Sequence, residues 1–268
     1  YKRQGMDITE KKKEFMGAVT GARKTIIDEV GNPRQLCNEK VFPAAVKLGY
    51  LDMCRTCSGI GKKISDEQRK DIFDKIGTEI KAQIEEADSI ANQKDFDELH
   101  EKLCQFCTEQ FKKYDYSITY GQAQKIINMA FKYLYCCEGA TEGIFTYCHM
   151  PLDSFILKWC SECDLPEKCN EDAWSKLEKD KYVKIQQEIR AYLNQGNTYK
   201  VGGNEVELPK TVLDAEFIIW PEEARRKSLK ELKNLLKKLG EDKYFVKNIS
   251  EDDKKALRES MKTIIKEK

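Results

Sequence analysis

Residues 116–136 read YSITYGQAQKIINMAFKYLYC, and residues 149–159 read HMPLDSFILKW. In the first stretch, apolar side chains occupy almost the whole circumference of a helix from Gln124 to Tyr135. Such a pattern is typical of a buried central helix and not of an amphipathic surface helix. We therefore expect a mainly α protein, a multi-helix bundle built around this segment.

The polar residues of this helix lie along one line. At about 100° per residue they fall within one stripe about 120° wide, which contains Gln122, Lys125, Asn128 and Lys132. Burial of an unpaired ammonium group is costly, so this stripe must face water, a carboxylate or a cavity. The nearest candidate carboxylate in the sequence is Asp153, which follows Pro-Leu and opens an apolar run as a helix N-cap. We expect a lysine and Asp153 to meet over one pocket.

Further helical patterns flank these two segments. Helices are predicted over residues 7–30, 35–48 and 50–57, from Ser65 onward, over 95–114, from Asn170 or Asp172 to the turn at Asn194, over 221–239, and from Ser250 to the C-terminus. Residues 198–208 fit a short β-hairpin around Gly202 and Gly203. Residues 211–220 fit either a short buried strand or an anchoring loop, and Pro221 is expected to be the first residue of the next helix.

Charge divides the chain into two parts. Fifteen Lys and Arg and ten Asp and Glu follow Trp220, whereas the whole chain of 268 residues has a formal net charge of +1. We expect a helical domain over residues 1–220, with the candidate site at 116–160, and a basic helical extension over 221–268 that belongs to the same domain or stands apart. Solvated helix faces explain this local surplus as well as phosphate contacts would. Net charge gives no argument for nucleic acid.

No apolar run approaches the length of a membrane helix, and the first residues are polar. We therefore expect no membrane association through a transmembrane segment and no signal peptide. The chain is rich in cysteine, with eleven residues, and this odd number argues against a fully paired secreted framework. The expected location is the reducing cytoplasm, and the sequence does not decide the oligomeric state.

The cysteines include three Cys-x-x-Cys pairs, namely Cys54 with Cys57, Cys104 with Cys107, and Cys160 with Cys163. Two such pairs could complete a four-thiolate zinc site. The third pair and Cys169 have the spacing of three iron–sulfur ligands, with Cys148 as one source of the fourth. However, Cys104 and Cys107 lie inside a strong helical pattern, where such residues usually pack. We expect buried free thiols and no metal or cofactor.

The two quoted stretches resemble helix-hairpin-helix DNA glycosylases. Residues 119–125, Thr-Tyr-Gly-Gln-Ala-Gln-Lys, resemble the Gly-x-Gly-x-Lys hairpin that leads into an apolar helix, and Met150–Asp153 resembles the apolar-Val-Asp that opens the next helix. The pattern is also similar to the archaeal 8-oxoguanine glycosylase branch, in which a lysine on a buried helix is followed after a longer gap by Pro-x-Asp. The resemblance covers residues 116–160. Ala123 replaces the second hairpin glycine, and Phe155 stands where many members have histidine.

This resemblance implies a helix-hairpin-helix-like centre and a glycosylase and abasic-site lyase activity on double-stranded DNA. Lys125 would attack the sugar C1′ and Asp153 would assist departure of the base, with Lys132 as a second candidate for the lysine. The flipped base would be held by substrate-binding residues among Tyr120, Gly121, Gln122, Gln124, Asn128 and Trp159.

The chemistry explains why these residue types matter. Cleavage of an N-glycosidic bond builds positive charge on the sugar, which a carboxylate stabilises, while an amine that adds to C1′ forms a Schiff base. A desolvated position disfavours the ammonium form of a lysine and frees its amine. The two histidines, His100 and His149, are expected to be hydrogen-bonded core residues and not acids or bases.

Two other functional hypotheses for the same residues stay open. In the first, the chain is a non-catalytic helical binding or regulatory protein, in which a buried Lys–Asp pair fixes core geometry and Asp153 is only an N-cap. In the second, the Cys-x-x-Cys pairs serve thiol-based redox sensing or zinc binding.

Overall fold

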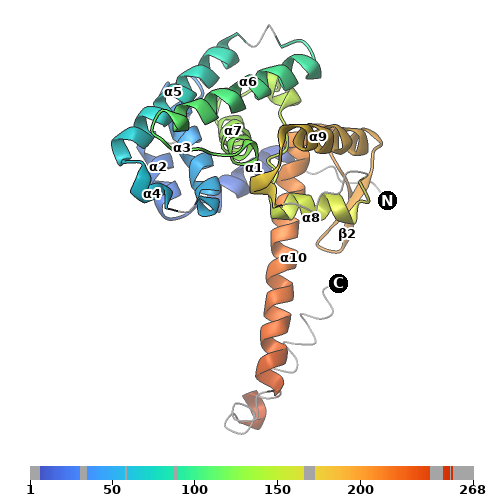
Figure 1. The fold of residues 1–268 in the computed structure, drawn as a ribbon. Helices are drawn as coiled ribbons and strands as arrows, with labels where there is room; N and C mark the ends of the chain where they lie inside the picture. Colours follow the sequence, from blue (N-terminus) through green and yellow to red (C-terminus); the bar gives the residue numbers. More distant parts are fainter. Residues whose placement is uncertain are drawn as a thin grey trace.

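The computed structural model describes residues 7–30, 35–57, 59–86, 90–165, 173–241, 250–253 and 255. This part of the chain is mainly helical and contains one small antiparallel sheet of two strands (Figure 1). The predicted mainly α class and the predicted hairpin are therefore confirmed. None of the helices in these residues combines the length and the apolar character that a membrane crossing requires.

In chain order, the elements are α1 (Ile8–Gly17), α2 (Ala22–Glu29), α3 (Val41–Met53), η1 (Cys54–Thr56), α4 (Ile60–Lys63), α5 (Asp66–Glu85), α6 (Gln93–Lys112), α7 (Tyr120–Tyr135), η3 (Gly143–Tyr147), α8 (Ser154–Glu162), η4 (Trp174–Lys176), α9 (Lys179–Asn194), β1 (Thr198–Val201), β2 (Asn204–Glu207) and α10 (Val212–Glu241). The strands pair from Thr198 opposite Glu207 to Val201 opposite Asn204.

Helix α7 is the centre of the molecule (Figure 1). It begins with a capping box, in which Thr119 and Gln122 satisfy each other's backbone N–H groups, and every residue from Gly121 to Tyr135 is buried. Helix α3 crosses it closely at Gly49, where a Cβ atom would lie 2.5 Å from the Ile126 carbonyl oxygen. The prediction of a buried central helix is confirmed.

Two apolar clusters make up the core. The first surrounds α7 with residues from α3, α5 and α6, and the second joins α8, α9, the hairpin and the start of α10. Leu213 and Phe217 of α10 belong to the first cluster, whereas Ile218 and Ile219 belong to the second. The first turns of α10 therefore lie between both clusters and connect them.

The structure corrects three predicted elements before the hairpin. Residues 7–30 form two helices and not one, because Gly21 takes a left-handed φ of 62° between them. The separate helices predicted over 35–48 and 50–57 are one helix, α3, which begins at Val41 and is followed directly by η1. The possible helix starts at Asn170 and Asp172 lie outside the described residues.

The structure also corrects the region after the hairpin. Residues 211–220 are neither a strand nor a loop, because α10 starts at Val212 and continues through them. Pro221 lies inside this helix and not at its start, and it lacks the N–H that would bond to the Phe217 carbonyl. Burial of Phe217, Ile218 and Ile219 on one side of the proline, and of Glu222 and Glu223 on the other, holds the helix in place around it.

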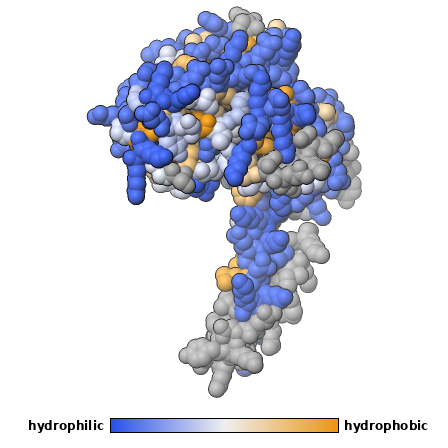
Figure 2. Space-filling view, in the orientation of Figure 1, coloured by the Kyte–Doolittle hydropathy of each residue, from blue (hydrophilic) through white to orange (hydrophobic). Residues whose placement is uncertain are grey.

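Beyond Glu223, α10 leaves the body of the protein as a long projecting helix (Figure 1). Its visible surface is largely hydrophilic (Figure 2), although Leu232 and Leu235 are exposed on it. The helix runs through the predicted boundary at residue 220, so a separate domain over 221–268 stays a prediction. Ser250 accepts a hydrogen bond from the Asp253 backbone N–H, and the rest of the predicted last helix lies outside the described residues.

The connection between α6 and α7 bears on the expected helix-hairpin-helix centre. Residues 113–119 join the two helices, and Asp115 takes a positive φ of 54° in this turn. Gly121 lies inside α7, where a Cβ atom would be 2.2 Å from the Trp174 carbonyl oxygen of η4. Glycine at this position is thus required for the packing of η4 on α7. The helix-hairpin-helix centre stays a prediction.

Candidate functional site

The polar stripe of α7 brings two lysines to carboxylates. Lys125 Nζ donates a hydrogen bond to Asp153 Oδ2 at 2.9 Å, and only 5% and 14% of these side chains are exposed. Lys132, about two turns further along α7, forms an ion pair with Glu216 of α10, and both side chains are almost completely buried. The predicted contact of a lysine with Asp153 is present, and Lys125 makes it.

Asp153 receives hydrogen bonds on both carboxylate oxygens. Oδ1 caps α8 by accepting from the backbone N–H groups of Phe155 at 2.9 Å and Ile156 at 3.1 Å, and Oδ2 accepts from Lys125 and, at 2.8 Å, from Trp220 Nε1. Burial opposes ionisation, but the charge of Lys125 and these donors outweigh it and lower the pKa of Asp153. The group is therefore a carboxylate at neutral pH.

The extended segment before Asp153 is held by two glutamine side chains. Gln124 Nε2 donates to the Leu152 carbonyl at 3.0 Å, and the Leu152 N–H donates to Gln124 Oε1 at 3.3 Å. Gln186 of α9 holds Met150 in the same way, with distances of 2.7 and 3.0 Å. Because these amides satisfy the buried backbone groups, α7 and α9 together fix the position of Asp153.

The second ion pair lies within an aromatic enclosure. Lys132 Nζ is 4.0 Å from the ring centre of Phe15, 4.7 Å from that of Phe217 and 5.9 Å from that of Trp220. These rings and Glu216 stabilise the buried ammonium group by cation–π and ionic interactions. Helices α1 and α10 thus supply the surroundings of Lys132.

Both pairs line one small cavity of about 140 Å³. The cavity lies between α1, the end of α3, η1, α7, the start of α8, η4 and α10. Its lining residues are Phe15, Asp52, Arg55, Lys125, Met129, Lys132, Tyr133, Asp153, Ser154, Phe155, Trp174, Glu216 and Trp220. The site therefore depends on segments from most of the described chain.

Most charges at the cavity are paired. Asp52 accepts hydrogen bonds from Arg23 Nε at 3.0 Å and from the Tyr133 hydroxyl at 3.0 Å. Arg55 is exposed, and its guanidinium has no hydrogen-bond or ion-pair partner among the described residues. The cavity therefore offers a cation to a ligand at Arg55.

Six residues expected to hold a base do not line this cavity, namely Tyr120, Gly121, Gln122, Gln124, Asn128 and Trp159. Gln122 completes the capping box of α7 and donates to Thr56 Oγ1 at 3.1 Å. Asn128 donates to Gln124 Oε1 at 2.9 Å and to the Tyr182 hydroxyl at 2.8 Å. These amides are occupied within the protein, and their role in substrate binding stays a prediction.

The two aromatic residues of this set are also packed inside the protein. Tyr120 packs edge-on against Tyr182, and the fully buried Trp159 packs against Tyr192 in the second core cluster. The aromatic side chains that line the cavity near Asp153 are Phe155, Trp174 and Trp220. A ligand in the cavity would meet these rings.

Sequence analysis did not single out Glu216, Trp220 or Arg55. Glu216 is one of two carboxylates, with Asp214, among the apolar residues of 213–219, and an acidic residue in such a stretch is a usable signal for a buried partner. Arg55 lies between Cys54 and Cys57 in a short predicted helix, and nothing in the sequence connects it with the cavity.

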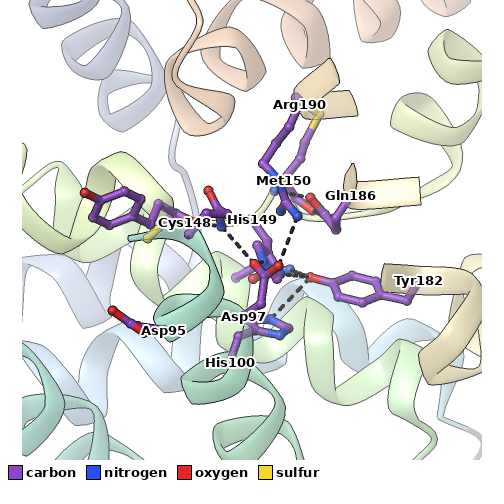
Figure 3. A network of polar contacts seen from close by, with 12 residues as sticks. Asp95, Asp97, His100, Cys148, His149, Met150, Tyr182, Gln186 and Arg190 are labelled. Atoms are coloured by element: carbon purple, nitrogen blue, oxygen red, sulfur yellow. Dashed lines mark hydrogen bonds and ion pairs between the residues drawn. The ribbon is translucent and has the colours of Figure 1, made fainter. Parts of the chain in front are cut away.

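A second buried polar network lies next to the site (Figure 3). His149 Nε2 is 2.7 Å from Asp97 Oδ1, and the Tyr182 hydroxyl is 2.9 Å from His149 Nδ1 and 3.3 Å from His100 Nε2. Arg190 also donates to Asp97, at 3.0 Å. These distances fit neutral imidazoles, with His149 donating to Asp97 and Tyr182 donating to His149, an assignment made from the network.

Burial lowers the pKa of both His149 and His100. Both rings are buried, and their centres lie 4.4 Å apart. They belong to the core, as the sequence predicts, and the cavity at Lys125 does not include them.

The cysteines form no metal centre in the part of the chain that the structure describes, where no cluster of three or more His, Cys, Asp or Glu residues could hold an ion. Cys104 and Cys107 pack inside α6, and burial raises the pKa of both thiols. Cys169, a candidate iron–sulfur ligand, lies outside the described residues.

Comparison of the chain with protein families, with curated proteins and with solved structures gives no match. The function of the site is therefore argued from its geometry and chemistry.

Proposed function

We propose that the protein is a DNA glycosylase and abasic-site lyase, in which Lys125 attacks the sugar and Asp153 assists. The observation that carries this proposal is the 2.9 Å contact of Lys125 Nζ with Asp153 Oδ2 at the wall of a cavity. The order of elements supports it, because the lysine lies on a buried helix and the carboxylate caps the next α-helix. The resemblance of residues 116–160 implies the same arrangement.

The contact suits a nucleophile and an assisting carboxylate. In the resting protein, Lys125 Nζ donates a hydrogen bond to Asp153 Oδ2, so attack by the amine includes transfer of a proton from Nζ to that oxygen. The amine lone pair then forms a bond to C1′ while the C1′–N bond breaks. The departing base keeps that electron pair and takes the proton from Asp153. The C1′–O4′ bond then breaks, a proton passes from the lysine nitrogen to O4′, and the resulting Schiff base permits strand cleavage.

The cavity limits what can enter. Its volume of about 140 Å³ is well below the roughly 300–1,000 Å³ of typical small-molecule pockets. It has room for one small group at Lys125, so the rest of a flipped nucleotide would lie along the rim. There Trp174 offers an apolar face and Arg55 offers a positive charge to a phosphate.

Borohydride trapping tests the proposal. Labelled duplexes that carry 8-oxoguanine, uracil or an abasic site are incubated with the protein and reductant, and base release is measured in parallel. We expect a covalent protein–DNA product on at least the abasic duplex. Absence of both a trapped product and base release on all three duplexes would refute the activity on these substrates.

Two substitutions separate the role of the amine from that of charge and packing. Lys125→Arg keeps a cation beside Asp153 but removes the nucleophile, and Lys132→Gln removes the amine that contacts Glu216. The first should abolish the trapped product, while the second should retain it. Circular dichroism and thermal melting confirm that each variant is folded.

A specific observation also favours the non-catalytic alternative. The Lys132–Glu216 pair is almost completely inaccessible to solvent, so this chain does use a lysine–carboxylate pair to connect helices of its core. The Lys125–Asp153 pair could do the same between α7 and α8 in a helical binding or regulatory protein. A folded wild-type protein that gives no trapped product and releases no base would favour this alternative.

A further inference from the structure

Part of α10 and the hairpin turn form a strongly basic groove outside the cavity. The groove has a volume of about 490 Å³. Its lining includes five positively charged side chains, those of Lys200, Arg225, Arg226, Lys230 and Lys233, against one carboxylate. The groove therefore carries a local excess of positive charge in a chain whose formal net charge is +1.

The carboxylate of the groove, Glu222, organises two of its cations. It accepts two hydrogen bonds from Arg225, both at 2.8 Å, and one from Arg226 at 3.1 Å. Burial opposes its ionisation, but the two arginines prevail and lower the pKa of Glu222. Arg226 also donates to the Lys200 carbonyl at 2.6 Å and packs over the Tyr199 ring. The guanidinium groups are thus held in fixed positions.

The three lysines of the groove remain available. Lys200, Lys230 and Lys233 have no hydrogen-bond or ion-pair partner among the residues that the structure describes. Lys230 and Lys233 lie on one face of α10, about 4.5 Å apart along its axis. A row of unpaired lysines beside positioned arginines is suited to a ligand with regularly spaced negative charges.

We propose that this groove binds the phosphate backbone of double-stranded DNA. The inference rests on the proposed function for the choice of DNA as the polyanion. The groove contains only one apolar lining side chain, Leu229, and so lacks the apolar anchors of a typical protein interface.

The groove lies close to the cavity along α10 but on another face of the helix. Trp220 at the cavity and Lys230 in the groove belong to the same helix, about 15 Å apart along its axis. At about 100° per residue, the groove residues of α10 lie largely on the face opposite Trp220. The groove is therefore a binding surface separate from the cavity.

Fluorescence anisotropy with a labelled duplex, at several salt concentrations, tests the inference. The test variant is Lys200→Gln/Lys230→Gln/Lys233→Gln. Its matched control, Lys94→Gln/Lys102→Gln/Lys112→Gln, removes three exposed lysines from α6. We expect the groove variant to lose at least about tenfold in affinity and to lower the slope of log K against log salt by about 2 to 3, since each phosphate contact contributes about 0.9. The control should bind like the wild type.

The outcomes separate this inference from the proposed function. Equal affinity and salt slope for the groove variant and the wild type would overturn the groove, and so would wild-type protein that binds polyglutamate or anionic lipid vesicles but no duplex. Groove-dependent binding without any borohydride-trapped product would leave the groove supported and refute the lyase. A product that forms at saturating DNA in the groove variant would support catalysis independently of the groove.

Discussion

Two lysines on one helix have different surroundings, and this difference assigns them different roles. Beside the small cavity, Asp153 accepts hydrogen bonds from Lys125, from the indole of Trp220 and from a backbone N–H group at the start of α8. The Lys132 ammonium group lies between the Glu216 carboxylate and aromatic rings. If it moved toward a substrate, the buried Glu216 carboxylate would lose its ion-pair partner, which is costly. Lys132 therefore has a structural role.

The structural role of Lys132 predicts a non-additive stability effect. Lys132→Met leaves Glu216 buried without its cation and should lower the free energy of unfolding by about 3–5 kcal/mol. The double variant Lys132→Met/Glu216→Leu removes both charges and should recover most of this loss. Urea unfolding measures both values. A double variant at least as unstable as the sum of the single variants would contradict the assignment.

The two buried histidines predict a pH dependence of stability. Their pKa values are lowered in the folded protein, so the unfolded chain binds more protons below its own histidine pKa of about 6.5. The contribution of the two histidines to the free energy of unfolding should be fully present above this pH. The free energy of unfolding should decrease by about 1–3 kcal/mol between pH 7.5 and pH 5.5. The lowered pKa of Asp97 affects stability only at lower pH, because its contribution is lost as the pH falls below about 3.8.

Urea unfolding at pH 7.5 and pH 5.5 checks this dependence. The His149→Gln variant keeps a polar group near Asp97, Arg190 and Tyr182 but cannot gain a proton in this range, so its stability should change less with pH. Equal stability of the wild-type protein at pH 7.5 and pH 5.5 would show that the histidines do not make stability depend on pH between these two values.

At the scale of elements, close helix contacts hold α7 in place. Gly49 allows α3 to cross it, and Gly121 allows η4 to lie against its first turn. A Cβ atom at either position would overlap backbone atoms, which cannot move aside as the end of a flexible side chain can.

Gly49→Ala should therefore destabilise the protein by about 1–3 kcal/mol, because the added methyl group forces α3 away from α7. Gly17→Ala is the matched control, since a Cβ atom there meets nothing within 4 Å, and it should leave stability unchanged or raise it by about 0.5–1 kcal/mol. Thermal and urea unfolding compare the two. Equal effects of the two substitutions would show that the crossing is not as close as described.

The elements also show what the sequence can predict. The burial of α7, its polar stripe and the N-cap at Asp153 follow from local periodicity and capping, and the structure confirms them. The pairing of Lys132 with Glu216 joins segments far apart in sequence, which no local pattern reports. Residues 211–220 were misassigned because a continuous apolar run fits a strand or a buried helix equally well, and only contacts with both core clusters decide it.

At the scale of the whole molecule, α10 has two distinct parts. Its first turns connect both core clusters and complete the cavity through Glu216 and Trp220, while the part beyond Glu223 projects from the body (Figure 1). Among the described residues after Glu223, none is buried. Folding should therefore require the first part and not the second.

A chain that ends at residue 228 should melt within about 3 °C of the full chain, a difference below about 1 kcal/mol for a protein of this size. It lacks Lys230 and Lys233 and should bind duplex DNA more weakly. A chain that ends at residue 211 loses Phe217, Ile218 and Ile219 from the core and should show no cooperative transition. Scanning calorimetry distinguishes these results, and cooperative melting of the shorter chain would contradict the role given to α10.

The most direct test of the central claim is the position of the covalent bond. Wild-type protein is reduced with borohydride on an abasic duplex, digested with protease and nuclease, and mapped by mass spectrometry. If Lys125 is the nucleophile, the sugar remnant should be found on Lys125. A remnant on Lys132, on the N-terminal amine or spread over surface lysines, with none on Lys125, would contradict the assignment of this site.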